Sequence, residues 1–241
     1  MNHSPREELQ LSRIFRSMND LAYCVIKCDE RLPGYGRGSD IDIFCLDLPA
    51  VSRRLLVLLG EQLGPGHLLD VQDDGHYSKI DLVEQESGEL VFRFDLYGGL
   101  PPYRHVALRP ALFESVLEGR VEKRIGQGDE ECTISVPSQL DDLLLRYVEY
   151  HEWYAERPDK IKHLAMVLDS PLVERRQLLD KLHHYVSLPT PQPLQPAHVP
   201  RVQALKDLLR KTPLIHLVRL ARRGVHQARH LLRRHTGLFR D

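Results

Sequence analysis

Hydrophobic and polar positions follow two different periods along the first hundred residues. Apolar side chains recur at helical spacing over residues 5–20 and again over 49–64. Short apolar or alternating runs, which are typical of strands, occupy 21–28, 40–47, 67–72, 76–83 and 90–97. The resulting order of helix, two strands, helix and three more strands predicts an α+β fold with a mixed β-sheet and flanking helices.

Helical spacing dominates the next part of the chain. Helices are predicted at 110–118, 138–155, 158–168 and 171–186. Ser138 is the expected N-cap of the second helix, because its hydroxyl can accept a hydrogen bond from a free amide of the first turn. Five prolines between 188 and 200 favour an extended linker, and basic helices are predicted at 201–211 and 214–235. These patterns divide the chain into an α/β domain (1–108), a helical domain (109–187), a Pro-rich linker (188–200) and a basic helical tail (201–241).

The composition is that of a soluble globular protein, with 42% hydrophobic and 28% charged residues among 241. The charge, however, is uneven. The tail from Arg201 holds eleven Lys/Arg and two Asp, a net charge of +9, whereas the first 200 residues carry −10. This asymmetry indicates that the two parts meet different partners, or each other.

The cysteines and the N-terminus indicate an intracellular protein. Four cysteines in a chain of this length do not make a disulfide framework, and Cys24 and Cys28 lack the two further ligands that zinc would need. The N-terminus lacks the apolar core of a signal peptide, and no run approaches the ~20 apolar residues that span a bilayer. The cytoplasm is therefore the expected compartment.

Two carboxylates alternate with isoleucines in the stretch Ser39-Asp40-Ile41-Asp42-Ile43. Residues two apart in a strand point to the same face, so Asp40 and Asp42 are expected side by side, where they repel each other unless a cation neutralises them. Mg²⁺ is bound in this way by one or two carboxylates together with the phosphates of a substrate. Asp95, an acid within the apolar run VFRFDLY, is a third candidate ligand, because an unpaired charge there would be costly.

A purely structural interpretation of these acids is also open. Asp40 and Asp42 would then lie on a solvated face of the sheet, and Asp95 would pair with Arg93 or with a nearby lysine. An isolated Asp-x-Asp has this role in most proteins. The glycine-rich loop before it, the aliphatic residues around it and the third acid favour the metal site here.

The pattern of strand, glycine-bearing loop, Ser-Asp-Ile-Asp-Ile, helix and later strand acid resembles the nucleotidyltransferase superfamily of the DNA polymerase β type, and in particular its minimal members. The resemblance covers residues 5–100 and, more weakly, 137–168. It implies that Asp40, Asp42 and Asp95 bind Mg²⁺ or Mn²⁺ as the catalytic triad of residues 1–108. It also implies that the helical domain covers the nucleotide or the acceptor.

The sequence departs from the family signature where a phosphate-binding Gly-Ser should follow the first strand. Gly38-Ser39 abuts the first aspartate instead. VIKCDERLP followed by GSDIDI is similar to a branch encoded among surface-polysaccharide genes, with lysine and cysteine replacing its Arg-Gly. The resemblance implies that Lys27 contacts a phosphate as a point charge, and it makes Ser39 and Lys160 further nucleotide-binding candidates. Cys28 restricts the backbone more than glycine would, which disfavours its close approach to a triphosphate.

The stretch that begins at Asp95, DLYGGLPPYRHVAL, is similar to an acceptor-side motif of the same branch. Tyr97, Tyr103 and Arg104 are the acceptor-binding candidates, because tyrosine stacks on sugars and arginine binds phosphate. Packing of a turn beside a surface arginine explains these residues equally well. Histidine catalysis by His151 or His163 is not expected, because related reactions use a carboxylate and a metal.

The tail has an apolar stripe of leucine, valine and alanine over 214–232, and arginines occupy its other positions. This pattern is typical of a helix that lies on an anionic membrane surface or binds a phosphate-rich partner. Docking on the acidic part of its own chain fits equally well. Nucleic acid is an unexpected partner, because Phe239 is the one aromatic side chain of the tail.

Three functions are compatible with these residues. The first is Mg²⁺-dependent transfer of a nucleotidyl group from an NTP to a hydroxyl of a sugar, phosphosugar or related small acceptor, in surface-polysaccharide biosynthesis. The second is a binding or scaffold module that has kept the fold, lost turnover and is recruited to a membrane glycan-assembly complex by its tail. The third is a toxin-like nucleotidyltransferase that modifies RNA or protein.

Overall fold

The computed structural model describes residues 9–187. All of these residues belong to one compact unit, Met1–Gln192, which contains both the sheet and the helical segment that follows it. The predicted linker and basic tail lie outside the described residues, and so does the start of the helix predicted at 5–20. Of that helix the structure describes α1 (Leu11–Arg16).

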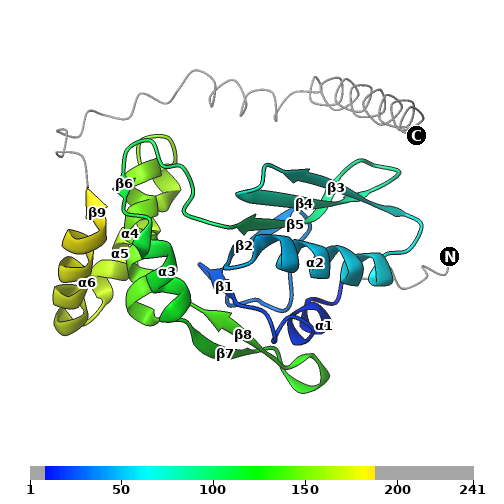
Figure 1. Ribbon diagram of the computed structural model, residues 1–241, viewed down its shortest axis with the longest axis horizontal. Helices are drawn as coiled ribbons and strands as arrows, with labels where there is room; N and C mark the ends of the chain where they lie inside the picture. The colour runs from blue at the N-terminus through cyan, green and yellow to red at the C-terminus, as the bar shows by residue number, and fades with distance from the viewer. Residues whose placement is uncertain (1–8, 188–241) are drawn as a thin grey trace. The chain divides into compact units, whose positions relative to one another are not determined.

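A five-stranded sheet forms the centre of the molecule (Figure 1). Its strands, in the order in which they lie in the sheet, are β1 (Tyr23–Ile26), β2 (Ser39–Cys45), β5 (Leu90–Tyr97), β4 (Tyr77–Glu84) and β3 (His67–Asp73). β2 and β5 are parallel, and all other neighbours are antiparallel. The predicted α+β class with a mixed sheet is therefore confirmed.

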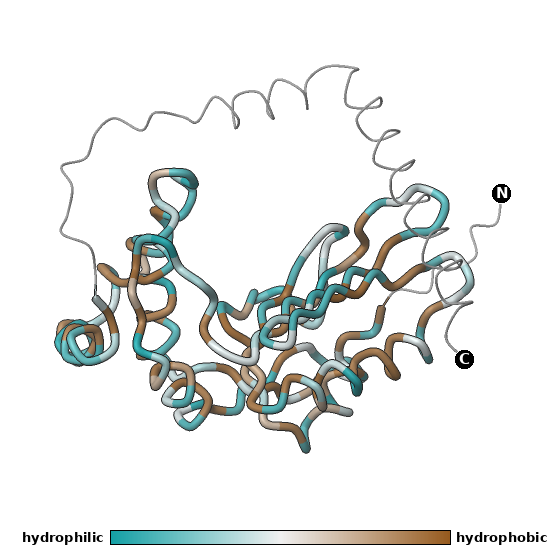
Figure 2. Tube along the Cα trace, turned by 45° about the horizontal axis from the view of Figure 1, so that its top comes forward, coloured by the Kyte–Doolittle hydropathy of each residue, from teal (hydrophilic) through white to brown (hydrophobic). Residues whose placement is uncertain are grey.

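One face of the sheet packs on α1 and α2 (Leu48–Gln62). Ile41, Ile43 and Cys45 of β2 join the same buried cluster as Leu55 and Leu59 of α2. Figure 2 shows hydrophobic positions recurring along α2 and along the strands beside it. Asp47 caps α2, because its side chain accepts a hydrogen bond of 2.9 Å from the amide of Ala50. Since Ile41 and Ile43 face this core, the alternate positions of β2 face the other way.

The opposite face of the sheet packs on the helical segment at its β1–β2 edge. The helices are α3 (Ala111–Glu118), α4 (Gln139–Trp153), α5 (Ile161–Asp169) and α6 (Leu172–Tyr185), with a 3₁₀ turn (Pro158–Lys160) before α5. Cys24, Ile26 and Phe44 join the buried cluster that these helices form. Ser138 caps α4 as predicted, since its Oγ accepts from the Asp141 amide at 3.2 Å.

Two strand pairs were not predicted. β7 (Val121–Ile125) and β8 (Cys132–Val136), joined by a 3₁₀ turn (Gly128–Glu130), form a hairpin, and β6 (Ala107–Leu108) pairs with β9 (Val186–Ser187). β7 reads Val-Glu-Lys-Arg-Ile, and only Ile125 of this strand is buried. In β8, by contrast, Cys132, Ile134 and Val136 are buried in alternation, and this period of two was readable from the sequence.

The structure also bears on the cysteines and on membrane spans. All four cysteines are free in this structure. Within residues 9–187, no helix combines the length and the apolar character that crossing a membrane requires.

Candidate functional site

The three aspartates predicted as metal ligands lie on one face of two neighbouring strands. Asp42 of β2 is the register partner of Asp95 of β5, and Asp40 lies opposite Arg93. Residues in register on neighbouring strands point to the same face, so Asp42 and Asp95 are adjacent, and Asp40, two residues before Asp42, shares that face. All three line one cavity of about 620 Å³.

The second wall of this cavity comes from the helical segment. Its residues there are Arg146, Glu149, Trp153, Arg157, Lys160, Lys162 and His163. Lys27 lies at the exit of β1, and Tyr97 and Tyr103 also line the cavity. Sequence-predicted candidates for metal, nucleotide and acceptor binding therefore meet in one place, although they come from segments far apart in the chain.

Ser39 and Arg104 are placed differently from the other candidates, since neither lines the cavity. Ser39 shares the face of Ile41, opposite to that of Asp40, and its Oγ accepts a hydrogen bond of 3.1 Å from the Gly36 amide. The Arg104 side chain is exposed.

Lys27 contacts carboxylates from both walls. Its Nζ lies 2.5 Å from Asp42 Oδ2 and 3.4 Å from Glu149 Oε1. Burial lowers the pKa of Lys27, but the charges of Asp42 and Glu149 raise it by more, and the net shift is upward. Lys27 is therefore charged at neutral pH, and it acts first as a counter-ion of Asp42.

Glu149 is the centre of a cluster of cationic groups. Its Oε1 accepts from Lys160 Nζ at 2.6 Å as well as from Lys27, and His163 Nδ1 lies 3.3 Å from its Oε2. Burial raises the pKa of Glu149, but Lys27 and Lys160 lower it by more, so the carboxylate is ionised at neutral pH. The sequence carried a signal for this residue, because Glu149 lies on the same side of α4 as the buried Leu145 and Val148.

Asp95 is the most buried of the three aspartates, with 7% of its surface exposed. Tyr77 donates a hydrogen bond to its Oδ1, and Tyr97 donates to Asp42 Oδ1 at 3.3 Å. Burial raises the pKa of Asp95 and the nearby charge of Asp42 adds to the rise, although the Tyr77 hydrogen bond opposes it. Arg93 forms its ion pair with Asp81, through Nε at 2.6 Å, rather than with Asp95.

The donor types of this site fit Mg²⁺, which prefers carboxylate oxygens together with phosphate oxygens and water. The positions of the three carboxylates, however, differ from those of a preformed metal site. Within residues 9–187, no group of three or more His, Cys, Asp or Glu side chains is arranged so that it could hold a metal ion directly. The cation in contact with Asp42 Oδ2 is the ammonium of Lys27, so a divalent ion can take the place beside this oxygen only if Lys27 moves.

A buried carboxylate that the sequence did not reveal as important positions the loop beside the cavity. Glu152 of α4 is 3% exposed, and its two oxygens accept three backbone hydrogen bonds. The donors are the amides of Arg104, His105 and Val106, at 2.7, 2.8 and 3.2 Å. Glu152 therefore holds the loop that carries Tyr103 against α4.

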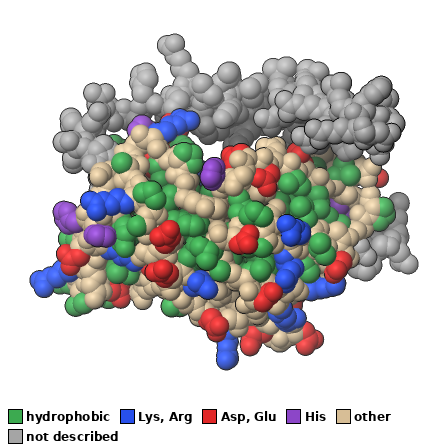
Figure 3. Space-filling view, in the orientation of Figure 1, with side chains coloured by type: hydrophobic (Ala, Val, Ile, Leu, Met, Phe, Trp, Pro, Cys, Tyr) green, Lys and Arg blue, Asp and Glu red, His purple; other side chains and the backbone are tan. Residues whose placement is uncertain are grey.

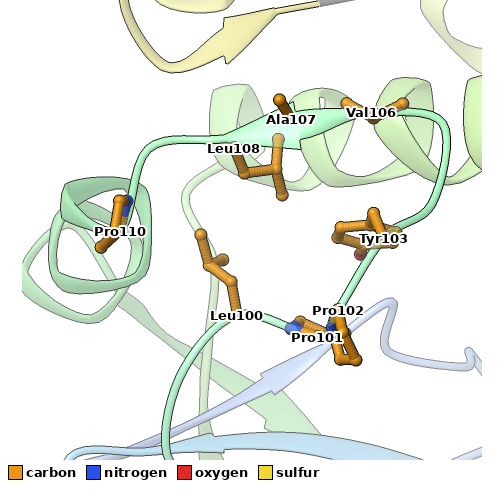
Figure 4. Close-up of a pocket in the computed structure, with 8 residues that line it drawn as sticks. All are labelled: Leu100, Pro101, Pro102, Tyr103, Val106, Ala107, Leu108 and Pro110. Atoms are coloured by element: carbon orange, nitrogen blue, oxygen red, sulfur yellow. The ribbon is translucent and has the colours of Figure 1, made fainter.

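The same loop encloses a second, smaller hollow of about 360 Å³. Leucine, proline, tyrosine, valine and alanine side chains line it (Figure 4). Pro101, Pro102 and Tyr103 line both this hollow and the larger cavity. One side of the loop thus faces the aspartates, and the other faces an apolar space.

His163 predicts a pH dependence of stability. Burial lowers its pKa to about 4 from 6.5, so between these values the unfolded chain binds the proton more readily than the folded one. The free energy of unfolding is therefore expected to decrease as the pH falls from about 6.5 to about 4. His163→Gln should make the loss between about pH 7 and about pH 5 smaller by about 1–2 kcal/mol, as measured by urea denaturation.

The matched control for this measurement is His76→Gln, because His76 is exposed in the turn before β4. This variant should retain the pH dependence of the wild type. An unchanged pH dependence in His163→Gln would show that His163 is not the group responsible.

Comparison with protein-family models and with curated protein sequences gives no match. Among solved structures, the chain is similar to MenT4, a nucleotidyltransferase toxin from Mycobacterium tuberculosis H37Rv. The two share 16% identity at a TM-score of 0.30, over 58% of this chain and 51% of the toxin chain. The match thus spans about half of that protein, and a similarity of this size does not establish a shared chemistry.

Proposed function

We propose that this protein is a Mg²⁺-dependent nucleotidyltransferase that acts on a hydroxyl of a sugar, phosphosugar or related small acceptor, in surface-polysaccharide biosynthesis. The observation that carries the proposal is the register of Asp42 with Asp95 across two parallel strands, with Asp40 on the same face. The three acids line a cavity whose volume is within the range of ~300–1,000 Å³ that is usual for small-molecule sites.

In the proposed reaction, the acceptor hydroxyl oxygen attacks the α-phosphorus of the NTP. The bond between the α-phosphorus and the oxygen bridging to the β-phosphate breaks, and pyrophosphate leaves. Mg²⁺ held by Asp40, Asp42 and Asp95 would neutralise the charge of the phosphates. Asp95 is the residue suited to take the acceptor proton, because its pKa is raised by burial and Tyr77 orients its carboxylate.

The wall opposite the acids has the chemistry to hold the rest of the nucleotide. Lys160 and Lys162 provide positive charge for the phosphates, and Trp153 offers a flat aromatic face to a base or sugar. Tyr97 and Tyr103 remain the acceptor-binding candidates within the cavity. Arg104 could join them only if its exposed side chain turned inward.

Trp153 provides the test, because it is the one tryptophan of the chain and it lines the cavity. Its fluorescence is expected to change saturably with at least one NTP in the presence of Mg²⁺. Without Mg²⁺, binding should be weaker by about tenfold or more, a difference of ~1.4 kcal/mol. Trp153→Phe should remove the optical signal, while calorimetry still detects binding. If no NTP binds to the wild type by either method, the proposal is wrong.

A binding module without turnover is a second candidate, and the contact of Lys27 with Asp42 favours it. Cys28, beside that lysine, lines the same cavity where the related branch has glycine. Nucleotide binding without release of pyrophosphate, in the presence of sugar phosphates as acceptors, would select this candidate. Release of pyrophosphate that depends on Asp42 would exclude it.

We also propose that the basic segment 201–241 contacts anionic membranes. Its net charge of +9 and its apolar stripe support this proposal. The face of the described part that is seen in Figure 3 carries acidic and basic side chains interspersed with hydrophobic ones. The full chain is expected to co-sediment with vesicles that contain phosphatidylserine, and a chain ending at 200 is expected to stay in the supernatant. Equal sedimentation of both chains would contradict the proposal.

A further inference from the structure

The Lys27 ammonium lies between two carboxylates that belong to different walls of the cavity. Asp42 is on the sheet, and Glu149 is on α4, 122 residues from Lys27 in the sequence. The contact with Asp42 is the closer of the two, at 2.5 Å against 3.4 Å. A small change in the side-chain torsion angles of Lys27 would bring its ammonium closer to Glu149 than to Asp42.

We propose that Lys27 is a built-in cation that competes with a divalent metal for Asp42, and that Glu149 receives its ammonium when the metal binds. This inference rests on the proposed function, because it takes Asp42 to be a metal ligand. It assigns Glu149 a role as a positioning residue that acts through Lys27.

Competition follows from the contact between Lys27 and Asp42. An ammonium at 2.5 Å from Asp42 Oδ2 occupies the space that a metal bound to this oxygen would need. Two cations at adjacent positions also repel each other, and the repulsion is stronger where solvent screens it less. Only 24% of the Lys27 side chain and 20% of the Asp42 side chain are exposed, so solvent screens this repulsion incompletely.

Glu149 can receive the displaced ammonium because one of its oxygens still accepts no hydrogen bond. His163 Nδ1 lies 3.3 Å from Glu149 Oε2, but in the described part of the chain neither atom has a hydrogen-bond partner. Oε1 is already shared by Lys160 and Lys27. A shift of Lys27 toward Oε2 would satisfy this buried acceptor, whose unmet hydrogen bond is costly as long as it persists.

The backbone of Lys27 is consistent with such a role. Its φ of +53° places it in the left-handed region, and within residues 9–187 it is the one non-glycine residue with positive φ. This conformation is uncommon for a residue with a side chain, and it persists where the surroundings over-determine it. At the exit of β1, it sets the direction from which the side chain enters the cavity.

The test is the affinity of the full chain for Mn²⁺ alone, measured by electron paramagnetic resonance of the free ion. Lys27→Met should bind Mn²⁺ about tenfold more tightly than the wild type, within the ~5–150-fold range that is usual for coupling between two ligands. Lys27→Arg retains the cation and serves as the matched control, with an affinity near that of the wild type. Lys27→Gln repeats the test if the methionine variant does not fold, as judged by circular dichroism.

Glu149→Gln separates competition from a merely structural role. Without its second anion, Lys27 should stay on Asp42, and Mn²⁺ affinity should fall by about fivefold. In the double variant with Lys27→Met, Glu149→Gln should have no effect on Mn²⁺ affinity, because the competing ammonium is gone. If Glu149 had a merely structural role, Glu149→Gln would weaken Mn²⁺ binding both with Lys27 and with Lys27→Met.

The outcomes distinguish this inference from the proposed function. If Lys27→Met binds Mn²⁺ no more tightly than the wild type while Asp42→Asn abolishes binding, the metal site stands and the competition is refuted. If Glu149→Gln weakens binding equally with and without Lys27, the transfer of the ammonium is refuted. If the wild type and every Lys27 variant fail to bind Mn²⁺, the metal site and the inference are both refuted.

Discussion

Asp95→Asn is expected to stabilise the protein at pH 7 while it strongly weakens Mg²⁺-dependent nucleotide binding. Asp95 is buried, and burial together with the charge of Asp42 raises its pKa, which means that the ionised form is disfavoured in the folded state. Asparagine has the same shape without the charge, and its Oδ1 can still accept the hydrogen bond from Tyr77. The free energy of unfolding should rise by about 1 kcal/mol, the low end of the ~1–3 kcal/mol cost of a poorly compensated buried polar group.

The same substitution removes a proposed metal ligand. Nucleotide affinity in the presence of Mg²⁺ should fall by about 100-fold, since loss of even a supporting residue around a metal costs ~10–100-fold. Urea denaturation measures the first effect, and titration of Trp153 fluorescence measures the second. Asp70→Asn is the matched control, because Asp70 belongs to the same sheet but does not line the cavity. If the affinity of Asp95→Asn for nucleotide is within about threefold of that of the wild type, Asp95 is not part of the proposed site.

Phe44→Ala is expected to cause the largest loss of stability, about 3–5 kcal/mol. Phe44 is fully buried, and its ring lies 5.0 Å from that of Phe113 on α3 and 6.1 Å from that of Tyr97. The side chain therefore joins the sheet to the helical segment. Truncation leaves a cavity at this junction, since the surrounding side chains relax only in part.

The measurement is urea or thermal denaturation, compared with Leu46→Ala. Leu46 comes two residues later and is 64% exposed, so its truncation should change the free energy of unfolding by less than about 0.5 kcal/mol. A single cooperative transition that shifts as a whole is expected for Phe44→Ala. Two separate transitions would mean that the sheet and the helical segment unfold independently and that Phe44 does not couple them.

Much of the secondary structure was predictable because it is encoded in local patterns. The strands predicted at 67–72, 76–83 and 90–97 match β3, β4 and β5 within one residue at each end. Apolar and aromatic residues recur in these segments, and turn residues such as Asp74-Gly75 and Ser87-Gly88 separate them, so the limits of the strands are encoded locally. The hairpin of β7 and β8 was missed, because β7 has charged residues at its three central positions and buries one side chain.

The sequence identified the three acids, which lie on one face of the sheet, whereas it left their ion-pair partners undetermined. Asp40 and Asp42 are two apart in one strand, so their common face follows from the pleat alone. The location of Asp95 beside Asp42 required that β5 lie parallel to β2 in the matching register, which no local pattern specifies. Ser39 was a nucleotide-binding candidate from the family resemblance, but its position next to Asp40 within the strand places it on the opposite face.

The sequence by itself determined that Asp40, Asp42 and Asp95 are acids within predicted strands, because strand periodicity is a property of the local chain. The tertiary structure alone decided what neutralises their charge. Lys27 and Glu149 are 122 residues apart, and only the packing of α4 over the sheet brings them together beside Asp42. The ion pairs of this cavity join residues that are far apart in the sequence. The distances between such residues are set by the packing of the whole domain.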